Sequence, residues 1–538
     1  MNAREQRKRA GSFAMLFESA LQAARAHDLA SAAELFADAL DLEPGHPAAH
    51  CNRATVLAEL KRWPEALAGY DRAVALKSDY AVAWSNRGNA LKELRRPAES
   101  LASFDRAIAI NPGIAEVWSN RGTVLKELNR LDESLASYDR AVRLDPLMAE
   151  AHSNRGIVLA ALGRGEAALA SYDRAVAIRP DDAEALSNRG IALYELRRIN
   201  EALESHDRAL ALDPHLAQAH FNRSMARLAL GDLAGGWLDH EWRWKMPAAD
   251  RRHFPQPLWL GKGSIAGSTV LLHGEQGLGD TLQFCRYAKH VADLGAAVVL
   301  EVPAALEGLL GGLNGAARVV ARGDSLPRFD LHCPLMSLPL AFNTTLTTIP
   351  SDVPYLHARD GLALQWRERL KGGSAPRVGL VWSGGFRADQ PGTWAVNGRR
   401  NIPLSRLAPL ALPGIEFHSL QKGEPAETEL AQAVARSWGG PRLINHSARL
   451  NDFLDTAALV ENLDLIITVD TSIAHLAGAM GKPVWILNRF DACWRWLLDR
   501  TDSPWYPTAR LYRQEAAGDW DGVIRQVAAD LAVFANAS

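Results

Sequence analysis

The sequence predicts an α-helical solenoid followed by two doubly wound α/β lobes. A segment that begins Asp-Arg-Ala recurs every 34 residues through the first half of the chain. Beyond residue 260, short apolar runs alternate with helical stretches, which is the pattern of parallel sheets covered by helices. Two turns rich in glycine or hydroxyl side chains directly follow two of these runs. The predicted domains are residues 1–250, 251–372 and 373–538.

The composition is that of a globular chain without a strong charge bias. Of 538 residues, 48% are hydrophobic, and 60 basic residues stand against 62 acidic ones. This balance gives no sign of nucleic acid or an anionic membrane as the main partner. The four cysteines lie far apart without a Cys-x-x-Cys pair, which favours a reducing compartment. We find no signal peptide and no apolar run of about 18 residues, so we expect a cytoplasmic protein without a membrane span.

The 34-residue period, with two helices in each repeat, is typical of the tetratricopeptide repeat (TPR). In the copy at 81–114, we expect a small residue to let the two helices approach and a large one to fill the core between repeats. We expect a proline to end the second helix. The repeat positions of this copy are Trp84, Gly88, Phe104, Ala107 and Pro112. Good copies cover 47–216, and degenerate end copies cover 13–46 and 217–250, which gives about seven repeats.

An asparagine occupies the same position in the first helix of six repeats. Asparagine is a poor helix former, so its regular placement predicts a role. We interpret the series as a ladder of amides on the concave face, which hydrogen-bonds the backbone of an extended acceptor peptide. The alternative is that each amide bonds within its own helix pair. The positions are Asn52, Asn86, Asn120, Asn154, Asn188 and Asn222.

An arginine follows each of these asparagines, from Arg53 to Arg223. Within a repeat, this arginine and an acidic residue of the second helix are present or absent together. The first repeat has Ser19 and Ala37 at the two positions, and the last combines Arg223 with Glu241. We therefore predict a bidentate arginine–carboxylate bridge between the two helices of a repeat, with a structural role.

A tryptophan-rich junction follows the repeats. We interpret it as packing of the last repeat onto the next domain, with ligand binding as the alternative. Its tryptophans are Trp237, Trp242, Trp244 and Trp259.

Seven apolar runs predict buried parallel strands. The first lobe has runs at 269–273, 297–302 and 329–333. After a polar link at 357–376, the second lobe has runs at 377–382, 416–421, 465–470 and 483–487. Two such Rossmann-like sheets in tandem form a cleft at the carboxyl ends of their strands, where ligands of this fold class bind.

Two clusters of polar residues stand at the ends of predicted strands. The first, HGEQGLGDT at 273–281, has glycines for a tight turn and Asp280 at the start of a helix. Its alternative interpretation is a glycine-rich turn in which Asp280 serves as the helix N-cap.

The second cluster is VDTSIAHLAGAMGKPV at 469–484. Its strand ends at Asp470, and a helix begins near Thr471 or Ser472. The free N–H groups of that helix start and the two hydroxyls form a site for a diphosphate. His475 lies one turn further and reaches the same ligand in this interpretation; taken alone, it would be a core histidine.

These motifs carry a resemblance. Gly279 to Leu282 (GDTL) and Asp470 to Ala479 (DTSIAHLAGA) resemble the heptosyltransferase-like family of inverting glycosyltransferases with the GT-B fold. The resemblance covers roughly residues 265–535. The repeats resemble the superhelix of O-GlcNAc transferase, whose asparagine ladder binds peptide. With GDWDGVI at 518–524, the whole chain is similar to bacterial TPR–glycosyltransferase fusions, some of which modify flagellin.

The resemblance implies roles for particular residues. In the family, the aspartate of the Gly-Asp motif is the proposed general base, which implies that role for Asp280 next to Gly279. The second motif binds the donor's phosphates, which implies Asp470, Thr471, Ser472 and His475. The chain departs from the family pattern at two places. One is Glu275–Gln276, and the other is Ser472, a position at which the family usually has glycine.

Other residues at predicted strand ends are candidates for donor binding. Ser383 follows the first strand of the second lobe, and Gln421 with Lys422 follows the second. Arg399 and Arg400 lie in a polar loop that either closes over the donor or remains solvated surface. We predict no metal: the Asp-x-Asp sequence at 519–521 is better explained by Asp521 as a helix cap. The nucleotide-sugar is then a co-substrate, and no cofactor is expected.

The sequence therefore predicts a cytoplasmic, metal-independent glycosyltransferase. It would transfer a sugar from a nucleotide-sugar to a Ser or Thr hydroxyl of an acceptor protein, flagellin or another surface protein, that the TPR groove recruits. The alternatives are a non-enzymatic TPR scaffold with an inactive GT-B domain, and a transferase that acts on a lipid-linked glycan.

Overall fold

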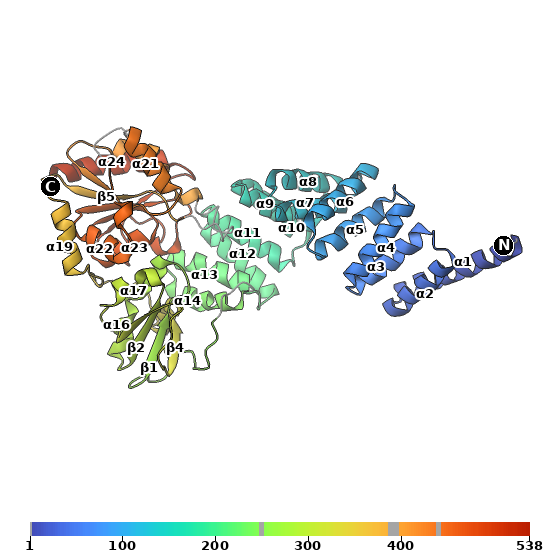
Figure 1. The fold of residues 1–538 in the computed structure, drawn as a ribbon, viewed down its shortest axis with the longest axis horizontal. Coiled ribbons are helices and arrows are strands. Elements are labelled where there is room, and N and C mark those ends of the chain that lie inside the picture. The colour runs from blue at the N-terminus through green and yellow to red at the C-terminus, as the bar shows by residue number, and fades with distance from the viewer. Residues whose placement is uncertain (1–2, 247–251, 386–397, 437–442, 538) are drawn as a thin grey trace. The chain divides into compact units, whose positions relative to one another are not determined.

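The computed structural model describes residues 3–246, 252–385, 398–436 and 443–537. The chain forms two compact units, Met1–Ala192 and Leu193–Ser538. Within the described residues the first unit is all helical, whereas the second combines the last helical repeats with two sheets (Figure 1). The domain limits expected at 250 and 372 follow the repeat and strand patterns and stay predictions.

The first unit is a series of helix pairs, which confirms the predicted solenoid. The first helices of successive repeats contact one another, as α5 does with α3 and α7, so the helices that carry the asparagines lie side by side. The helices are α1 (Ala3–Arg25), α2 (Leu29–Leu42), α3 (Pro47–Glu59), α4 (Trp63–Leu76), α5 (Ala81–Glu93), α6 (Pro97–Ile110), α7 (Ala115–Glu127), α8 (Leu131–Leu144), α9 (Ala149–Ala161), α10 (Gly165–Ile178) and α11 (Ala183–Glu195), which runs into the second unit.

Close helix packing depends on the repeat glycine, as predicted. A Cβ atom on Gly88 would lie 2.7 Å from the ring of Phe104, and one on Gly156 would lie 2.6 Å from the ring of Tyr172. Both rings are buried. The aromatic residue of the second helix therefore occupies the space that a larger residue on the first helix would need.

The arginine–carboxylate pairs of the first unit join neighbouring repeats, so the bridge predicted within each repeat is wrong there. Arg87 on α5 donates from Nε to Asp71 on α4 at 2.7 Å and from Nη1 to Ser103 on α6 at 2.6 Å. One carboxylate oxygen is bound in place of two, because the second nitrogen reaches the serine. In the repeat before Arg53, the acidic position is occupied by Ala37, so Arg53 has no such carboxylate. Its Nε lies 3.4 Å from the carbonyl oxygen of Ala33. The other pairs of this kind are Arg121–Asp105, Arg155–Asp139 and Arg189–Asp173.

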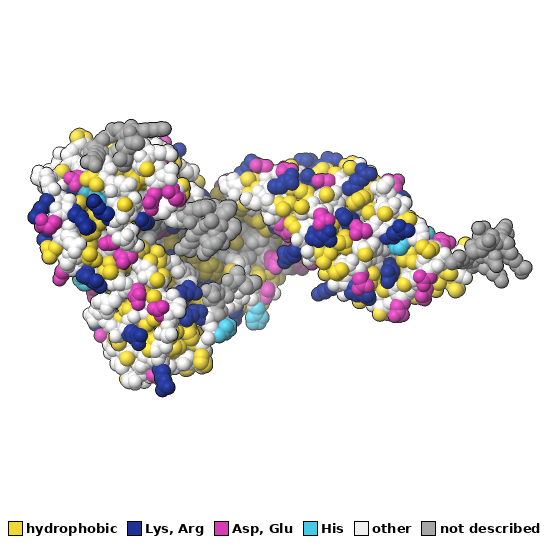
Figure 2. All heavy atoms as spheres, viewed as in Figure 1, with side chains coloured by type: hydrophobic (Ala, Val, Ile, Leu, Met, Phe, Trp, Pro, Cys, Tyr) yellow, Lys and Arg dark blue, Asp and Glu magenta, His cyan; other side chains and the backbone are white. Residues whose placement is uncertain are grey.

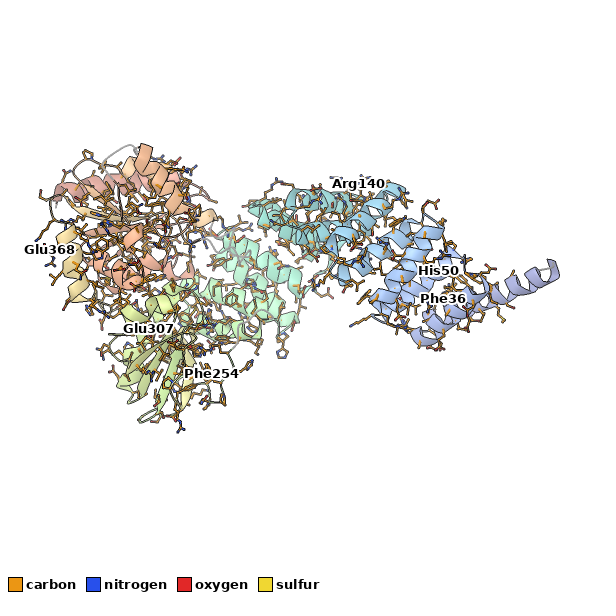
Figure 3. All side chains as sticks on the ribbon, in the orientation of Figure 1. Phe36, His50, Arg140, Phe254, Glu307 and Glu368 are labelled. Atoms are coloured by element: carbon orange, nitrogen blue, oxygen red, sulfur yellow. The ribbon has the colours of Figure 1, made fainter. Side chains whose placement is uncertain are left out.

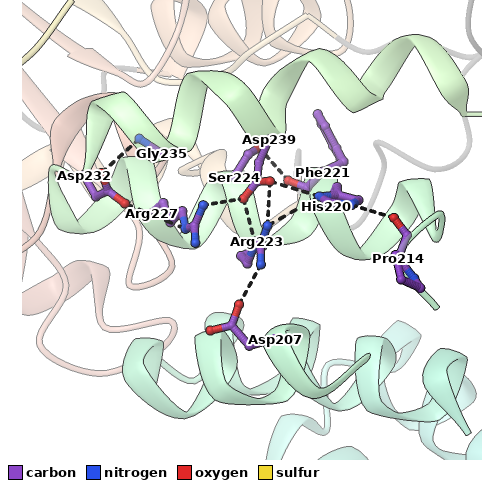
Figure 4. A network of polar contacts seen from close by, with 10 residues as sticks. All are labelled: Asp207, Pro214, His220, Phe221, Arg223, Ser224, Arg227, Asp232, Gly235 and Asp239. Atoms are coloured by element: carbon purple, nitrogen blue, oxygen red, sulfur yellow. Dashed lines mark hydrogen bonds and ion pairs between the residues drawn. The ribbon is translucent and has the colours of Figure 1, made fainter. Parts of the chain in front are cut away.

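The second unit begins with helices that continue the repeat pattern and end in a buried ion network (Figure 4). Arg223 binds Asp239 through two hydrogen bonds of 2.7 and 2.8 Å, and it reaches Asp207 at 2.7 Å. The predicted partner Glu241 binds Arg243 instead, because helix α14 has ended one residue before it. These helices are α12 (Ile199–Leu212), α13 (Ala217–Leu230) and α14 (Leu233–His240).

The first sheet is parallel, with strand order β3-β2-β1-β4. The runs predicted at 269–273 and 297–302 are strands β1 and β2. The third begins two residues later than predicted, because Asp330 exchanges hydrogen bonds with Thr269 at the sheet entrance. Its strands are β1 (Thr269–His273), β2 (Ala297–Val302), β3 (Arg318–Ala321) and β4 (Leu331–Pro334), with helices α15 (Leu278–Phe284), α16 (Tyr287–Asp293), α17 (Ala304–Leu310) and α18 (Leu338–Ala341).

The second sheet is also parallel, with order β10-β9-β8-β5-β6-β7. The link predicted at 357–376 contains helix α19, whose Trp366 is buried. The final helix is capped by Asp519, which accepts from the N–H of Gly522, and not by Asp521 as predicted. The elements are β5 (Arg377–Val381), β6 (Glu416–Ser419), β7 (Leu443–Asn445), β8 (Leu465–Val469), β9 (Val484–Asn488) and β10 (Ala509–Arg513), with α19 (Asp360–Arg369), α21 (Ala426–Arg436), α22 (Phe453–Glu461), α23 (Ser472–Ala479) and α24 (Trp520–Ala537).

The tryptophan-rich junction packs the last repeat onto the sheets, as predicted. The ring of Trp237 is buried edge-on against Trp494 and Phe284, with centroids 5.2 and 6.3 Å apart. Trp259 is buried against Phe342. The final helical repeat and both sheets therefore share one core.

The surface charges agree with the near balance of acidic and basic residues in the sequence. Figure 2 shows acidic and basic side chains interspersed over the visible face of the helical repeats. In the part of the chain that the structure describes, no helix combines the length and the apolar character that a membrane crossing needs.

Candidate functional site

Asp280 lies in the first turn of α15, directly after the loop that leaves β1. It is the third helical residue, with Gly277 as the N-cap, so the predicted N-cap alternative is corrected. One carboxylate oxygen accepts from the N–H of Gly277 at 2.8 Å, and the other is paired with the guanidinium of Arg495. The Asp280 side chain is 21% exposed, so it remains accessible to a ligand.

Arg495 is the residue of this site that the sequence did not indicate. Besides Asp280, it binds the side-chain oxygen of Gln283 at 2.6 Å. Burial alone would lower the pKa of Arg495, but Asp280, Cys493 and Asp470 raise it above its ordinary value, so the group is cationic. It stands between Trp494 and Trp496, and no local pattern indicates a partner 215 positions away.

The second predicted motif reaches the same place from the second sheet. Helix α15 packs on α23, and a Cβ atom on Gly279 would lie only 2.8 Å from His475. Gly279 therefore permits the close approach of the two motifs. His475 is buried, bonds the hydroxyl of Tyr506 at 3.0 Å and stacks on Trp496. Burial, with Arg495 and Arg286 nearby, lowers the pKa of His475 well below its usual value, so the ring is neutral.

The two hydroxyls at the start of α23, those of Thr471 and Ser472, differ in their hydrogen bonds. Thr471 is the N-cap, and its Oγ1 accepts from the N–H of Ile473 at 3.3 Å. The Ser472 hydroxyl is partly exposed and makes no hydrogen bond to a residue that the structure describes. Of the two, Ser472 is therefore the one available to a ligand.

Arg400 connects Asp470, which follows β8, to the segment that follows β5. Arg400 donates to the carbonyl of Asp470 at 3.0 Å, and its guanidinium covers Gly384, where a Cβ atom would clash. Because Asp470 also acts electrostatically on Arg495, the residues around Asp280 and those around Asp470 form one polar cluster.

Three further residues predicted to bind the donor, Gln421, Ser383 and Lys422, make different contacts. Gln421 is buried and fastens the neighbouring strand end, accepting from the N–H of Trp382 and Ser383 and donating to the carbonyl of Ser383. The Ser383 hydroxyl donates to the carbonyl of Gly384. Lys422 is exposed and donates to the carbonyl of Ser447 at 2.7 Å, away from the Asp280 cluster.

Arg399 lines a cavity of about 370 Å³ at the ends of β9 and β10. It forms ion pairs of 3.0 Å with Glu195 and Asp491. Gln514 lies in the wall of this cavity, and its buried amide nitrogen has no partner in the described part of the chain. Residues 386–397 of the predicted loop lie outside the described residues.

The predicted asparagine positions are partly exposed, and their contacts differ along the series. The Asn86 amide lies 3.4 Å from Thr55 of the preceding repeat, Asn154 lies 3.5 Å from Lys126, and Asn222 accepts from Gln218 in its own helix. Asn86 and Asn154 thus contact the preceding repeat in these bonds, and not the second helix of their own. The side chains with no hydrogen bond to a described residue are Asn52, Asn120 and Asn188.

Metal binding was not expected from the sequence. Among the described residues, no three His, Cys, Asp or Glu side chains gather in a way that would hold an ion. Independence from metal stays a prediction.

The chain contains tetratricopeptide repeats by comparison with known families: models of this repeat match residues 23–88, 85–146, 119–183 and 183–216. Protein FlbA of Caulobacter vibrioides (strain ATCC 19089 / CIP 103742 / CB 15) is 27% identical over 334 residues, which are 57% of this chain and 54% of FlbA. The chain thus spans about half the length of this curated relative.

Solved TPR structures are similar over part of the chain. YrrB, described as a TPR protein with an unusual peptide-binding site, is 28% identical, with a TM-score of 0.32 over 35% of this chain and 96% of its own. A TPR protein from Parabacteroides merdae ATCC 43184 is 18% identical, with a TM-score of 0.38 over 45% of this chain and 95% of its own.

Proposed function

We propose that this protein is an inverting GT-B glycosyltransferase that moves a sugar from a nucleotide-sugar to a Ser or Thr hydroxyl of an acceptor protein. One observation carries the proposal. Asp280 at the end of the first sheet and the start of α23 at the end of the second meet through Arg495 and through Gly279 on His475. Ligands of doubly wound sheets bind at such strand ends.

Asp280 is the proposed base. The ion pair with Arg495 fixes the direction of the carboxylate. An oxygen that accepts one hydrogen bond retains a second lone pair, with which it can accept the proton of an incoming hydroxyl. His475 is neutral and its Nδ1 bonds the hydroxyl of Tyr506, so we assign it a supporting role in the geometry of the site.

The donor's phosphates would lie at the start of α23. The helix dipole, the Ser472 hydroxyl and the guanidinium of Arg400 together offer positive charge and donors to a leaving diphosphate. Charge that develops on the leaving group is thereby stabilised in place. The TPR helices would hold the acceptor protein, flagellin or another surface protein, through the asparagine amides.

Asp280→Asn tests the proposal. The full chain is incubated with a panel of nucleotide-sugars and candidate acceptor proteins, and acceptor mass and released nucleotide are measured. The variant should lose transfer by a factor on the order of 10² or more, because the amide cannot take the proton. Its melting temperature and its nucleotide binding should persist.

Asp499→Asn is the matched control, since it makes the same change in an exposed carboxylate that pairs with Arg197. It should retain activity. If the wild-type chain transfers no sugar to any acceptor, or if Asp280→Asn matches it, the catalytic role is refuted and a scaffold function is favoured.

A further inference from the structure

A pocket lies near the carboxyl end of the first sheet, and residues of β1 and β4 line it together with the residue that follows β3. Its volume is about 120 Å³. His273 ends β1, His332 lies in β4, and Arg322 directly follows β3. Glu301 of β2 holds Arg252, which lines the mouth. The order β3-β2-β1-β4 reverses direction between β1 and β4, so the two histidines stand at the switch point where open sheets bind ligands.

His273 carries an unused hydrogen-bonding atom into this pocket. The residue is 3% exposed, and its Nε2 lies 3.2 Å from Nδ1 of His332. Its other nitrogen, Nδ1, is buried with no partner in the part of the chain that the structure describes. A buried polar atom without a partner costs free energy, so a ligand that bonds to it gains affinity.

The charges around His273 favour an anion. Burial, together with His332, Arg252, Arg243 and Arg322, lowers the pKa of His273 to about 3, so the neutral ring stands in a positive potential. When His332 donates to Nε2, the proton of the neutral ring is on Nδ1, which then points a donor into the pocket.

The acidic residues nearby already have partners. Glu275 accepts from Nε and Nη2 of Arg243, at 3.0 and 2.9 Å, and from the N–H of Met336. Glu301 pairs with Arg252. These carboxylates therefore do not satisfy His273 Nδ1.

We propose that this pocket binds a carboxylate, and that the carboxylate belongs to a sugar acid. His273 Nδ1–H and the guanidinium groups of Arg252 and Arg322 are the donors. Phe254, labelled in Figure 3, lies with its ring 5.4 Å from that of His273 and 4.9 Å from that of His332, and supplies an apolar face for a sugar ring. Gly274 and Glu275, which belong to the loop from His273 to the helix of Asp280, also line the pocket, so the pocket borders the loop that leads to the proposed base.

Binding is tested directly and does not depend on transferase activity. The full chain, labelled with ¹³C-histidine, is titrated with glucuronate and, as the control, with glucose, which has the same ring without the carboxylate. Histidine ring signals are followed by NMR, and the His273 signal is assigned by its loss in His273→Gln. Saturable shifts of the His273 signal with glucuronate and none with glucose are expected.

Two variants guard against misfolding. Arg252→Gln lies at the mouth, is 27% exposed and should weaken glucuronate binding by about tenfold, the effect of losing a charged hydrogen bond. His152→Gln in the first unit should change nothing. A matched pair of short peptides with Glu or Gln covers the other source of a carboxylate, an acidic acceptor side chain.

Selective binding of the Glu peptide would retain the carboxylate pocket but overturn its assignment to a sugar acid. Equal shifts with glucose and glucuronate, no shift with any carboxylate, or full affinity in Arg252→Gln would overturn the proposal.

Discussion

At the scale of residues, the site is made by a few side chains whose neighbours in space are remote in sequence. Asp280 and Arg495 are 215 positions apart, and Gly279 meets His475 across two sheets. Each local motif is intelligible alone, as a helix start after a strand. The chemistry depends on their meeting, because the guanidinium orients the carboxylate and the glycine makes room for the ring.

The two hydroxyls at the start of α23 give a residue-level prediction. Ser472→Ala should weaken nucleotide-sugar binding by about 3- to 10-fold, since its hydroxyl has no described partner to lose but can donate to a phosphate. Thr471→Ala removes the cap and should lower the free energy of unfolding by about 1 kcal/mol. Calorimetric titration and thermal denaturation measure the two effects. Unchanged donor affinity in Ser472→Ala would exclude that hydroxyl from the donor site.

At the scale of elements, the repeats are joined by one arginine that contacts helices on both sides. Arg121 on α7 binds Asp105 on α6 and Ser137 on α8, each at 2.7 Å. The pattern repeats along the first unit, and it links each helix pair to the previous one. Stability is therefore shared between neighbouring repeats, as in other solenoids.

Arg121→Ala should lower the free energy of unfolding of the first unit by about 0.2–1 kcal/mol. The modest size follows from the exposure of Asp105, 51%, because solvent screens the pair. Arg140→Ala, labelled in Figure 3 and exposed on α8, is the control and should be neutral. Urea denaturation of both variants provides the measurement. Equal midpoints would show that the bridge adds nothing.

The asparagine ladder is tested by replacing Asn120, Asn154 and Asn188 together with Ala. Alanine is the better helix former, so the melting temperature should hold or rise slightly. If the amides bind acceptor backbone, each loss removes about 0.5–1.5 kcal/mol, and transfer to a protein acceptor should fall steeply while donor hydrolysis continues.

The matched control for the ladder replaces Arg140, Arg174 and Arg208 with Ala; these arginines are exposed on the second helices of the same repeats. That triple variant should bind the acceptor normally. Normal acceptor modification by the asparagine variant would contradict the ladder.

At the scale of the whole molecule, neutral histidines buried in the second unit link stability to pH. Burial lowers the pKa of His206 and His446 to about 4 and that of His418 to about 3. When the chain unfolds, each ring regains an ordinary pKa near 6.5. The unfolded chain then binds more protons between pH 6.5 and about 4, so the free energy of unfolding must fall as the pH falls through that range.

His206→Phe should remove part of this acid sensitivity. His206 stands where Phe104, Tyr138 and Tyr172 stand in other repeats, and neither of its ring nitrogens has a partner among the described residues. The variant should unfold with a higher denaturation midpoint at pH 5 than the wild type, and the gap should narrow at pH 7.5. Parallel pH profiles for the two proteins would show that His206 is not one of the titrating groups.

The repeats could be read from the sequence because their contacts are local and periodic. The position of Gly88 predicts the close approach to Phe104, and β1 and β2 follow from continuous apolar runs that only a buried parallel strand explains. The edge strands β7 and β10 were not predicted, since one has three residues and the other carries Arg510 and Arg513.

The amino-acid sequence by itself determined the period of the helices, the central strands and the two polar turns after β1 and β8. Only the tertiary structure decided which residues of remote segments contact one another. In it, Arg87 pairs with Asp71 of the preceding repeat, and Arg495 pairs with Asp280. Nδ1 of His273, beside His332, has no hydrogen-bond partner among the described residues. The reason is physical: periodicity and strand propensity act over a few residues, whereas an ion pair or an unsatisfied buried atom depends on distances between segments that no local pattern encodes.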